Sequence, residues 1–527
     1  MARADPTTRF APVPEPTPSS PDRRQALIAL GYGAASLTAL WRWATASGES
    51  DATPADSADG SSAGPRTVPA IDQAPAEPTD EHLYDLVIAN GRVMDPDSRY
   101  DRAANVGIDG GTIVAVKEAA LRGKRTIDAR GRVVAPGFID ILSYEPDDLG
   151  ATYKIGDGVT TNLGMHGINS TASNFFARYT DKSMVNFGGA FDDPWHRAYV
   201  YGISPAEPAT EYQIGQLAAE LEKQLHEGWI GVDFEPEYTP GIDFAEMKAL
   251  AAVAAKYGVP ATFHGRYSAY GTNAQTLDEI IRVGQETGAA VHVEHIISTG
   301  GTWDMAGALK RLADARKQGV KITSCMYPYN FWATFLGSPR FAPGWEERFR
   351  ISYDDLQVAG TPERLTAETF EAAQADNLLA AAFAIPEEDV RTCLRDPTTM
   401  IGSDGILTDG NNHPRATGCF ARTLGRYARD QKTLSLMDAL AKMTILPAKW
   451  LQPKAPALAR KGRLQRGADA DITVFDPRTV IDRSTVADPE EFSAGIEWVL
   501  IGGQIVKTPQ GVDGAIRAGK PIVSNLA

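Results

Sequence analysis

The chain has 527 residues, too many for one average domain but compatible with a large α/β barrel and a smaller unit. Apolar residues make up 43% of the sequence and charged residues 23%, as is usual for soluble globular proteins. The formal net charge of −15 argues against a nucleic-acid partner, because such a partner calls for a basic face.

The N-terminal segment has the pattern of an export signal. Arg23 and Arg24 precede an apolar run over residues 26–40, and residues 44–46 (Ala-Thr-Ala) have the small-x-small form of a cleavage site. An arginine pair before a mildly apolar segment is typical of the twin-arginine route. We therefore expect residues 1–46 to be an export signal and the protein to be periplasmic or extracellular. The alternative is an uncleaved anchor, the only membrane association that the sequence predicts, although such a run is shorter than the roughly 20 residues of a membrane span.

Residues 47–82 are rich in Ala, Ser, Pro, Asp and Gly, so they are predicted to form a disordered linker. Strand patterns follow at both ends of the remaining chain. Residues 84–93 have the pattern of strand, turn and strand, with Asn90-Gly91 at the turn. Similar β patterns return at residues 471–476 and 498–506. We expect a small β-sandwich assembled from residues 83–137 and 457–527.

Between these ends, short apolar strands alternate with helical patterns. Residues 213–226 and 244–257 have helical spacing, and residues 259–264 and 290–295 have the pattern of buried strands. This alternation predicts a parallel sheet, and a (β/α)8 TIM-type barrel over residues 138–456 accounts for it best. Residues 335–395 break the rhythm and are predicted to be an insertion.

Four candidate metal ligands follow predicted strands. His264 and His295 each end an apolar strand, His166 follows residues 159–165, and Asp404 follows residues 399–403. In a (β/α)8 barrel such positions lie at the catalytic rim, and three imidazoles with one open position are typical of catalytic zinc. A single histidine at a strand end is more often structural, so the prediction depends on the whole set. His292 has the opposite strand parity to His295, and we expect it to face away.

Several short motifs occur in an order that resembles the N-acyl-D-amino-acid deacylase (D-aminoacylase) family of the amidohydrolases. The resemblance covers roughly residues 83–510 and rests on residues 264–266 (HGR), His295, residues 327–329 (YPY), residues 402–405 (GSDG) and residues 413–415 (HPR). It implies one zinc ion held by His264 and His295, with Asp404 beside the metal as general base. It further implies that Arg415 binds the substrate carboxylate and that Tyr327 polarises the carbonyl group. Tyr329 and Arg266 are carried over as further substrate-binding residues.

The sequence departs from the family pattern at three places. His166 stands where the family has a cysteine ligand, and it remains a competent third ligand. Leu142 and Tyr144 replace the HxH pair that serves a second, looser metal, so we expect a single zinc ion. Ile297 replaces a lysine that contacts substrate in the family, which puts the usual substrate in doubt.

The resemblance and the candidate site predict a metal-dependent hydrolase of amide bonds, acting on an N-acyl amino acid, especially an N-acyl-D-amino acid, or a related peptide. Two alternatives remain. The same site could open a cyclic amide or remove a terminal D-residue, in a pocket altered by Leu142, Tyr144 and Trp332. The protein could also be a metal-free pseudoenzyme that binds an acylated ligand, although retention of His166 argues against this.

Overall fold

The computed structural model describes residues 78–79, 81–407 and 413–527. The predicted export signal and most of the predicted linker therefore lie outside the described residues. Within those ranges, no helix has both the length and the apolar character that crossing a membrane requires.

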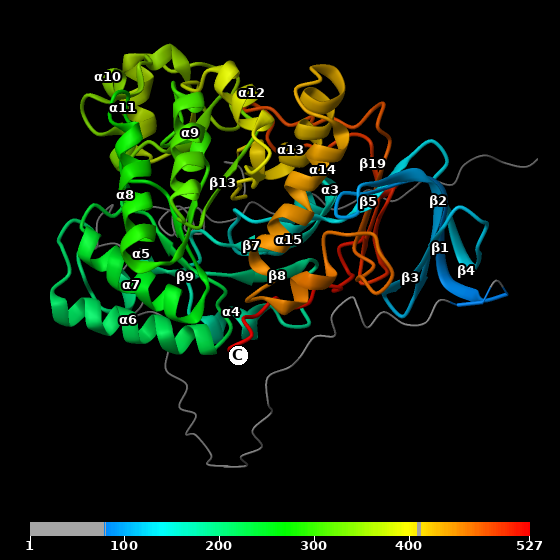
Figure 1. Cartoon of the computed structure of the whole chain (residues 1–527). Coiled ribbons are helices and arrows are strands. Elements are labelled where there is room, and N and C mark those ends of the chain that lie inside the picture. The colour runs from blue at the N-terminus through cyan, green and yellow to red at the C-terminus, as the bar shows by residue number, and fades with distance from the viewer. Residues whose placement is uncertain (1–77, 80, 408–412) are drawn as a thin grey trace, which may run out of the picture.

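A β-rich domain brings the two ends of the described chain together, at the right of Figure 1, where blue and red strands lie side by side. Its strands follow the order β21-β20-β19-β18-β5-β1-β2-β3, and β4 pairs with β1. The two ends join where β18 pairs antiparallel with β5. The strands are β1 (Leu83–Asp95), β2 (Tyr100–Asp109), β3 (Thr112–Lys117), β4 (Arg122–Asp128), β5 (Val133–Pro136), β18 (Ile472–Phe475), β19 (Ile496–Ile501), β20 (Gln504–Thr508) and β21 (Gly511–Val512).

The prediction of a hairpin turn at Asn90-Gly91 is wrong. Strand β1 continues through this point and pairs with β2 on both sides of it. Asn90 has a φ of 62°, and the register shifts between Ile88 and Gly91, which is a β-bulge. The Asn90 amide donates to Asn105 Oδ1 at 2.9 Å. A residue with positive φ serves a bulge as well as a hairpin turn, so the local sequence did not distinguish the two.

Parallel strands form the barrel in the middle of the chain. Strands β6, β7 and β8 pair in sequence, and after Ala190 the order continues as β9-β10-β11-β12-β13-β17. The barrel closes where Asp404 N donates to Leu142 O at 2.7 Å and Ser143 bridges Gly405. With β8 and β9 taken as one interrupted strand, the described residues form the predicted (β/α)8 barrel. The strands are β6 (Phe138–Asp140), β7 (Val159–Gly164), β8 (Asn186–Gly189), β9 (Phe191–Asp192), β10 (Val232–Phe234), β11 (Pro260–Phe263), β12 (Ala290–Val293), β13 (Ile322–Met326) and β17 (Met400–Ile401).

Helices cover the outside of the barrel and bury their apolar faces against the strands (Figure 1). Helix α7, for example, starts at the N-cap Asp243 and ends at Gly258, whose φ of 71° reverses the chain into β11. The helices are α3 (Asp148–Gly156), α4 (Ala172–Tyr179), α5 (Asp193–Trp195), α6 (Glu211–His226), α7 (Phe244–Tyr257), α8 (Asn273–Thr287), α9 (Met305–Lys317), α12 (Glu387–Arg395), α13 (Arg415–Arg422), α14 (Leu436–Met443) and α15 (Ile445–Leu451).

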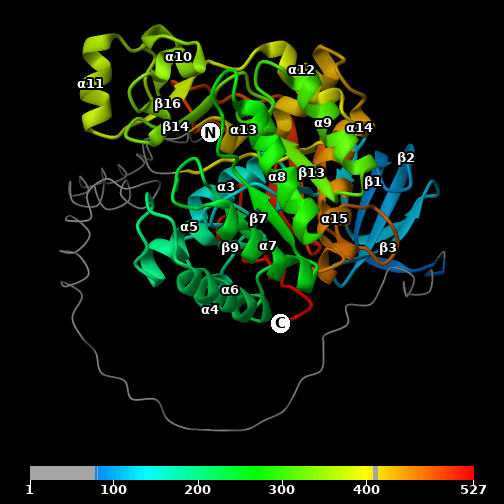
Figure 2. The same cartoon turned by 60° about the vertical axis from the view of Figure 1, so that its left-hand side comes forward.

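The segment between β13 and β17 adds a small unit of its own, at the upper left of Figure 2. Its strands pair antiparallel in the order β14-β16-β15, and two helices lie beside them. The elements are β14 (Trp332–Phe335), α10 (Trp345–Phe349), β15 (Leu356–Val358), α11 (Ala367–Ala375) and β16 (Leu379–Ala382). This unit supplies residues to the rim of the barrel.

The last residues do not stay in the β-rich domain, to which the sequence analysis assigned them. They return to the barrel, where Lys520 N donates to Asn186 Oδ1 at 3.1 Å and Ile522 N donates to Phe187 O at 2.7 Å. Ser524 Oγ donates to Leu225 O at 2.7 Å, in α6. The C-terminus accordingly lies beside α4 and α6 in Figure 1. The strand pattern of residues 498–506 gave no indication of this return.

Candidate active site

The carboxyl ends of the barrel strands carry the candidate catalytic side chains. His166 follows β7, His264 follows β11, His295 follows β12, Tyr327 follows β13 and Asp404 follows β17. The backbone turns sharply at two of these positions, because His295 has a φ of 23° and Asp404 a φ of 51°. Such conformations cost about 1–3 kcal/mol and tend to occur at functional sites.

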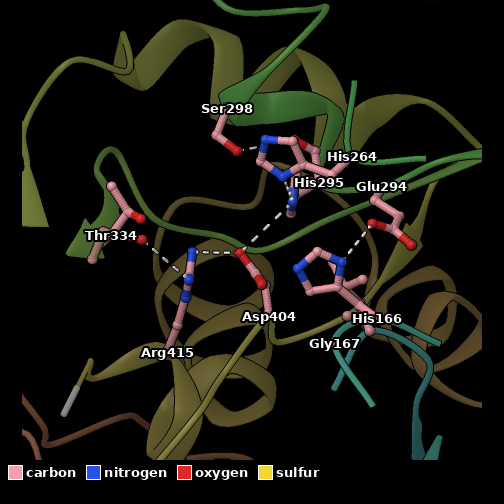
Figure 3. A network of polar contacts seen from close by, with 12 residues as sticks. His166, Gly167, His264, Glu294, His295, Ser298, Thr334, Asp404 and Arg415 are labelled. Atoms are coloured by element: carbon pink, nitrogen blue, oxygen red, sulfur yellow. Dashed lines mark hydrogen bonds and ion pairs between the residues drawn. The ribbon is translucent and has the colours of Figure 1, made fainter. Parts of the chain in front are cut away.

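The three histidines converge on one point. Their candidate ligand nitrogens lie within 4.8 Å of one another, and all three side chains are buried. His264 Nδ1 lies 3.0 Å from His295 Nε2, which in turn lies 4.0 Å from Asp404 Oδ2 (Figure 3). Burial lowers the pKa of both His264 and His295 well below the usual value, so both imidazoles are neutral, as metal ligands must be. This donor set fits a zinc ion with His166, His264 and His295 as ligands.

Buried carboxylates surround the third histidine. His166 Nδ1 lies 3.0 Å from Glu294 Oε2, 3.5 Å from Asp233 Oδ2 and 3.6 Å from Glu235 Oε1. Burial alone would lower the pKa of His166, but these carboxylates raise it well above the usual value. Burial also raises the pKa of Glu294 to about 8. A metal ion bound to this histidine would displace a proton from the cluster, because only a deprotonated ring nitrogen binds a metal.

Asp404 faces both the candidate metal ligands and the guanidinium group of Arg415. Arg415 Nη1 lies 2.7 Å from Asp404 Oδ2, and the Tyr144 hydroxyl donates to Asp404 Oδ1 at 3.3 Å. Burial raises the pKa of Asp404, although Arg415, His166 and Tyr144 oppose that shift. Tyr144 thus contacts Asp404, the predicted general base, while Leu142 packs in the apolar interior and accepts a hydrogen bond from the Asp404 backbone amide.

A small, partly open cavity lies in front of these groups. Two guanidinium groups line it, those of Arg415 and Arg340. Arg340 comes from the inserted unit, donates to Ser298 O at 2.7 Å and stacks 4.1 Å above the ring of Trp332. Its Nε lies 3.5 Å from Glu237 Oε2. The remaining lining residues are His166, Tyr238, His264, His295, Ser298, Tyr327, Trp332, Ala333 and Asp404.

Tyr327 lies in this cavity, with Arg415 4.7 Å above its ring. Burial raises the pKa of its phenol to about 12, so the hydroxyl keeps its proton and is a donor at neutral pH. Tyr329 lies behind the cavity, where its hydroxyl donates to Pro414 O at 3.2 Å and so supports the turn that carries Arg415.

Arg266 does not line the cavity, in contrast to its predicted contact with substrate. Its Nε donates to Glu279 at 3.1 Å and its Nη2 to Ile242 O at 2.6 Å. These contacts hold the loop after β10 against α8. His292 also stays away from the site, as expected, and stacks on Trp450 in α15 at 4.4 Å.

Several residues of the site were not predicted from the sequence. The carboxylates Asp233, Glu235 and Glu294 lie at the ends of β10 and β12, and the acid at every second position in residues 232–235 was an available signal. Arg340 lies in an insertion without periodicity, so no sequence pattern indicated that it reaches the cavity.

The chain is similar to known proteins in sequence and in fold. The profile of the amidohydrolase family matches residues 352–507. An N-acyl-D-glutamate deacylase of Alcaligenes xylosoxydans xylosoxydans is 34% identical, over 80% of this chain and 93% of that protein. A D-aminoacylase of the same organism is 28% identical, over 85% of this chain and 99% of that protein.

Among solved structures, N-acyl-D-glutamate deacylase of Bordetella bronchiseptica has a TM-score of 0.72 and 29% identity. The similarity covers 84% of this chain and 100% of the other. That structure contains zinc and a phosphonate inhibitor that mimics the tetrahedral reaction intermediate.

Proposed function

The chain belongs to the amidohydrolase family, in its branch of metal-dependent N-acyl-D-amino-acid deacylases, and we propose that it prefers N-acyl-D-amino acids with a carboxylate side chain. The observation that carries this preference is the pair of guanidinium groups, Arg340 and Arg415, that line one cavity. A substrate of this class has two carboxylates, one for each guanidinium.

Arg415 suits the α-carboxylate because it lies beside Asp404, where the scissile amide must sit. Its planar fork of donors matches a carboxylate bidentately. Arg340 suits the side-chain carboxylate. A guanidinium has five N–H donors, and the described residues leave Arg340 Nε without a hydrogen bond. Arg340 also supplies a cation although Ile297 stands where the resemblance implied a lysine.

The donor set supports one zinc ion on the cavity side, held by His166, His264 and His295. When bound, this ion supplies Lewis-acid polarisation of the amide carbonyl and of a water molecule. Asp404 accepts the proton of the attacking water and passes it to the departing amine. The Tyr327 hydroxyl, protonated at neutral pH, donates to the carbonyl oxygen as negative charge develops there.

Two other functions have less support. The same residues could open a cyclic amide or remove a terminal D-residue, but such substrates offer no second carboxylate to Arg340. A metal-free binding protein would not need three histidines with converging nitrogens.

Hydrolysis of matched substrates tests the proposal. We expect purified protein with added zinc to cleave N-acetyl-D-glutamate and N-acetyl-D-aspartate with a kcat/KM at least tenfold above that for N-acetyl-D-methionine. The L-enantiomers are the controls and should be poor substrates. Equal rates on the acidic and the apolar D-substrates would refute the role of Arg340 in selection.

We also propose that the protein is exported by the twin-arginine route, which transports folded proteins. The support is the Arg23-Arg24 pair before the apolar run of residues 26–40. Replacing both arginines by lysine should block export of the protein from producing cells. Unchanged export of that variant would contradict the assignment.

A further inference from the structure

Three carboxylates converge on one nitrogen of His166, on the side of the ring away from the cavity. The distances from Nδ1 to the oxygens of Glu294, Asp233 and Glu235 are 3.0, 3.5 and 3.6 Å. These side chains come from the ends of β10 and β12, and each is at most 5% exposed. The other ring nitrogen of His166 points toward Asp404 (Figure 3).

Hydrogen bonding to His166 does not account for this arrangement. A ring nitrogen donates one proton, so it serves one of the three carboxylates. Distances of 3.5 and 3.6 Å are too long for such bonds. In the part of the chain that the structure describes, Glu294 Oε2 faces His166 Nδ1, Glu294 Oε1 has no hydrogen-bond partner, and none of the three carboxylates pairs with a lysine or arginine. Buried carboxylates left in this way are costly.

The spacing matches the ligand shell of a small divalent cation. Imidazole nitrogens and carboxylate oxygens bind Zn²⁺ at about 2.1 Å, and two ligands of a tetrahedral ion are then about 3.4 Å apart. The three observed distances bracket this value. In addition, Asp233 accepts a backbone hydrogen bond from Gly167 N at 3.2 Å, which is typical support for a carboxylate ligand.

We propose that His166 Nδ1, Asp233, Glu235 and Glu294 bind a second divalent cation, so that the imidazole of His166 bridges two ions. Zn²⁺ and Mn²⁺ are the candidates, because imidazole suits zinc and carboxylates suit manganese. Binding releases the ring proton of His166 to solvent, which leaves an imidazolate with one lone pair for each ion.

The charges of this arrangement balance. Two dications face three carboxylates and one imidazolate, while Asp404 and Arg415 neutralise each other in their ion pair. The buried centre is therefore neutral as a whole, which is the condition for placing so many charged groups away from water. The second ion would use neither Leu142 nor Tyr144 as a ligand.

The metal content of the full chain tests the proposal. The protein is saturated with Zn²⁺, freed of unbound metal by gel filtration, and analysed by elemental mass spectrometry. We expect two zinc ions per chain in the wild type and one in Glu294→Gln. The matched control is Glu279→Gln, which alters a partly buried carboxylate 3.1 Å from Arg266 Nε, outside the cavity, and should keep two.

A second variant and a folding measurement distinguish the loss of a metal ligand from misfolding. Asp233→Asn removes another ligand with little change of shape, and circular dichroism with thermal unfolding shows whether each variant is folded. One zinc per chain in the wild type would overturn the proposal, and so would two in both Glu294→Gln and Asp233→Asn. The deacylase assay is a separate measurement, so a wrong substrate assignment would not change these counts.

Discussion

Replacing Arg340 by methionine tests whether Arg340 binds the side-chain carboxylate of the substrate while Arg415 binds the α-carboxylate. Methionine keeps an unbranched side chain of similar length and removes the charge, so the stack on Trp332 persists in part. Hydrogen bonds to charged groups contribute about 1.5–3 kcal/mol, or roughly 10- to 150-fold in kcat/KM. Because Glu237 already faces this guanidinium at 3.5 Å, we expect the lower part of the range, about 10- to 30-fold.

The loss should depend on the substrate. For Arg340→Met, kcat/KM for N-acetyl-D-glutamate should fall by that factor, whereas kcat/KM for N-acetyl-D-methionine should change by less than about threefold. Arg340→Lys retains a point charge without the planar fork, and its effect should be intermediate. Arg415→Met is the comparison variant, since it should reduce kcat/KM for both substrates alike.

Steady-state rates of amine release give these ratios, with thermal unfolding as the control for stability. If Arg340→Met lowered kcat/KM equally for both substrates, Arg340 would not contact the side chain. Its role would then be to support the cavity through Ser298 and Glu237.

Three further predictions concern the catalytic base and stability. Asp404→Asn should lower kcat by about 10²- to 10⁴-fold with unchanged zinc content, measured by elemental mass spectrometry; retained activity would exclude Asp404 as the base. Tyr144→Phe removes a hydrogen bond that lowers the pKa of Asp404, so the acid limb of the kcat/KM–pH profile should move to higher pH, and an unmoved limb would contradict this contact. Burial lowers the pKa of His196 to about 4, so the unfolded chain takes up protons between pH 6.5 and 4 and the folded protein does not. Denaturant unfolding should therefore show about 2 kcal/mol less stability at pH 5 than at pH 7 from this residue, and His196→Gln should reduce that difference.

The fold and the metal ligands could be predicted because they depend on local patterns. His264 and His295 end apolar strands, and the carboxyl ends of all barrel strands meet at one rim, so strand endings alone bring them together. Asn90 shows the limit of such patterns, because the positive φ that it adopts occurs both in hairpin turns and in β-bulges.

The groups that tune the site were not predictable in the same way. Glu294 shares the strand parity of His292, which faces outward, yet it lies beyond the end of β12 and turns inward to His166. Arg340 reaches the cavity only through the folding of an insertion. For Arg266 the HGR motif predicted a contact with substrate. In the structure its guanidinium group instead donates a hydrogen bond to Glu279.

The return of the C-terminal residues to the barrel has a consequence for biosynthesis. Lys520 and Asn186, which hydrogen-bond beside β8, are 334 residues apart in the chain. At about 5–20 residues per second, a ribosome needs roughly 20–70 s to make the intervening chain. During that time β8 lacks the segment that covers it, so the barrel cannot complete its packing while the chain is still growing. A nascent chain of this protein therefore exposes barrel surface to chaperones until synthesis is nearly complete.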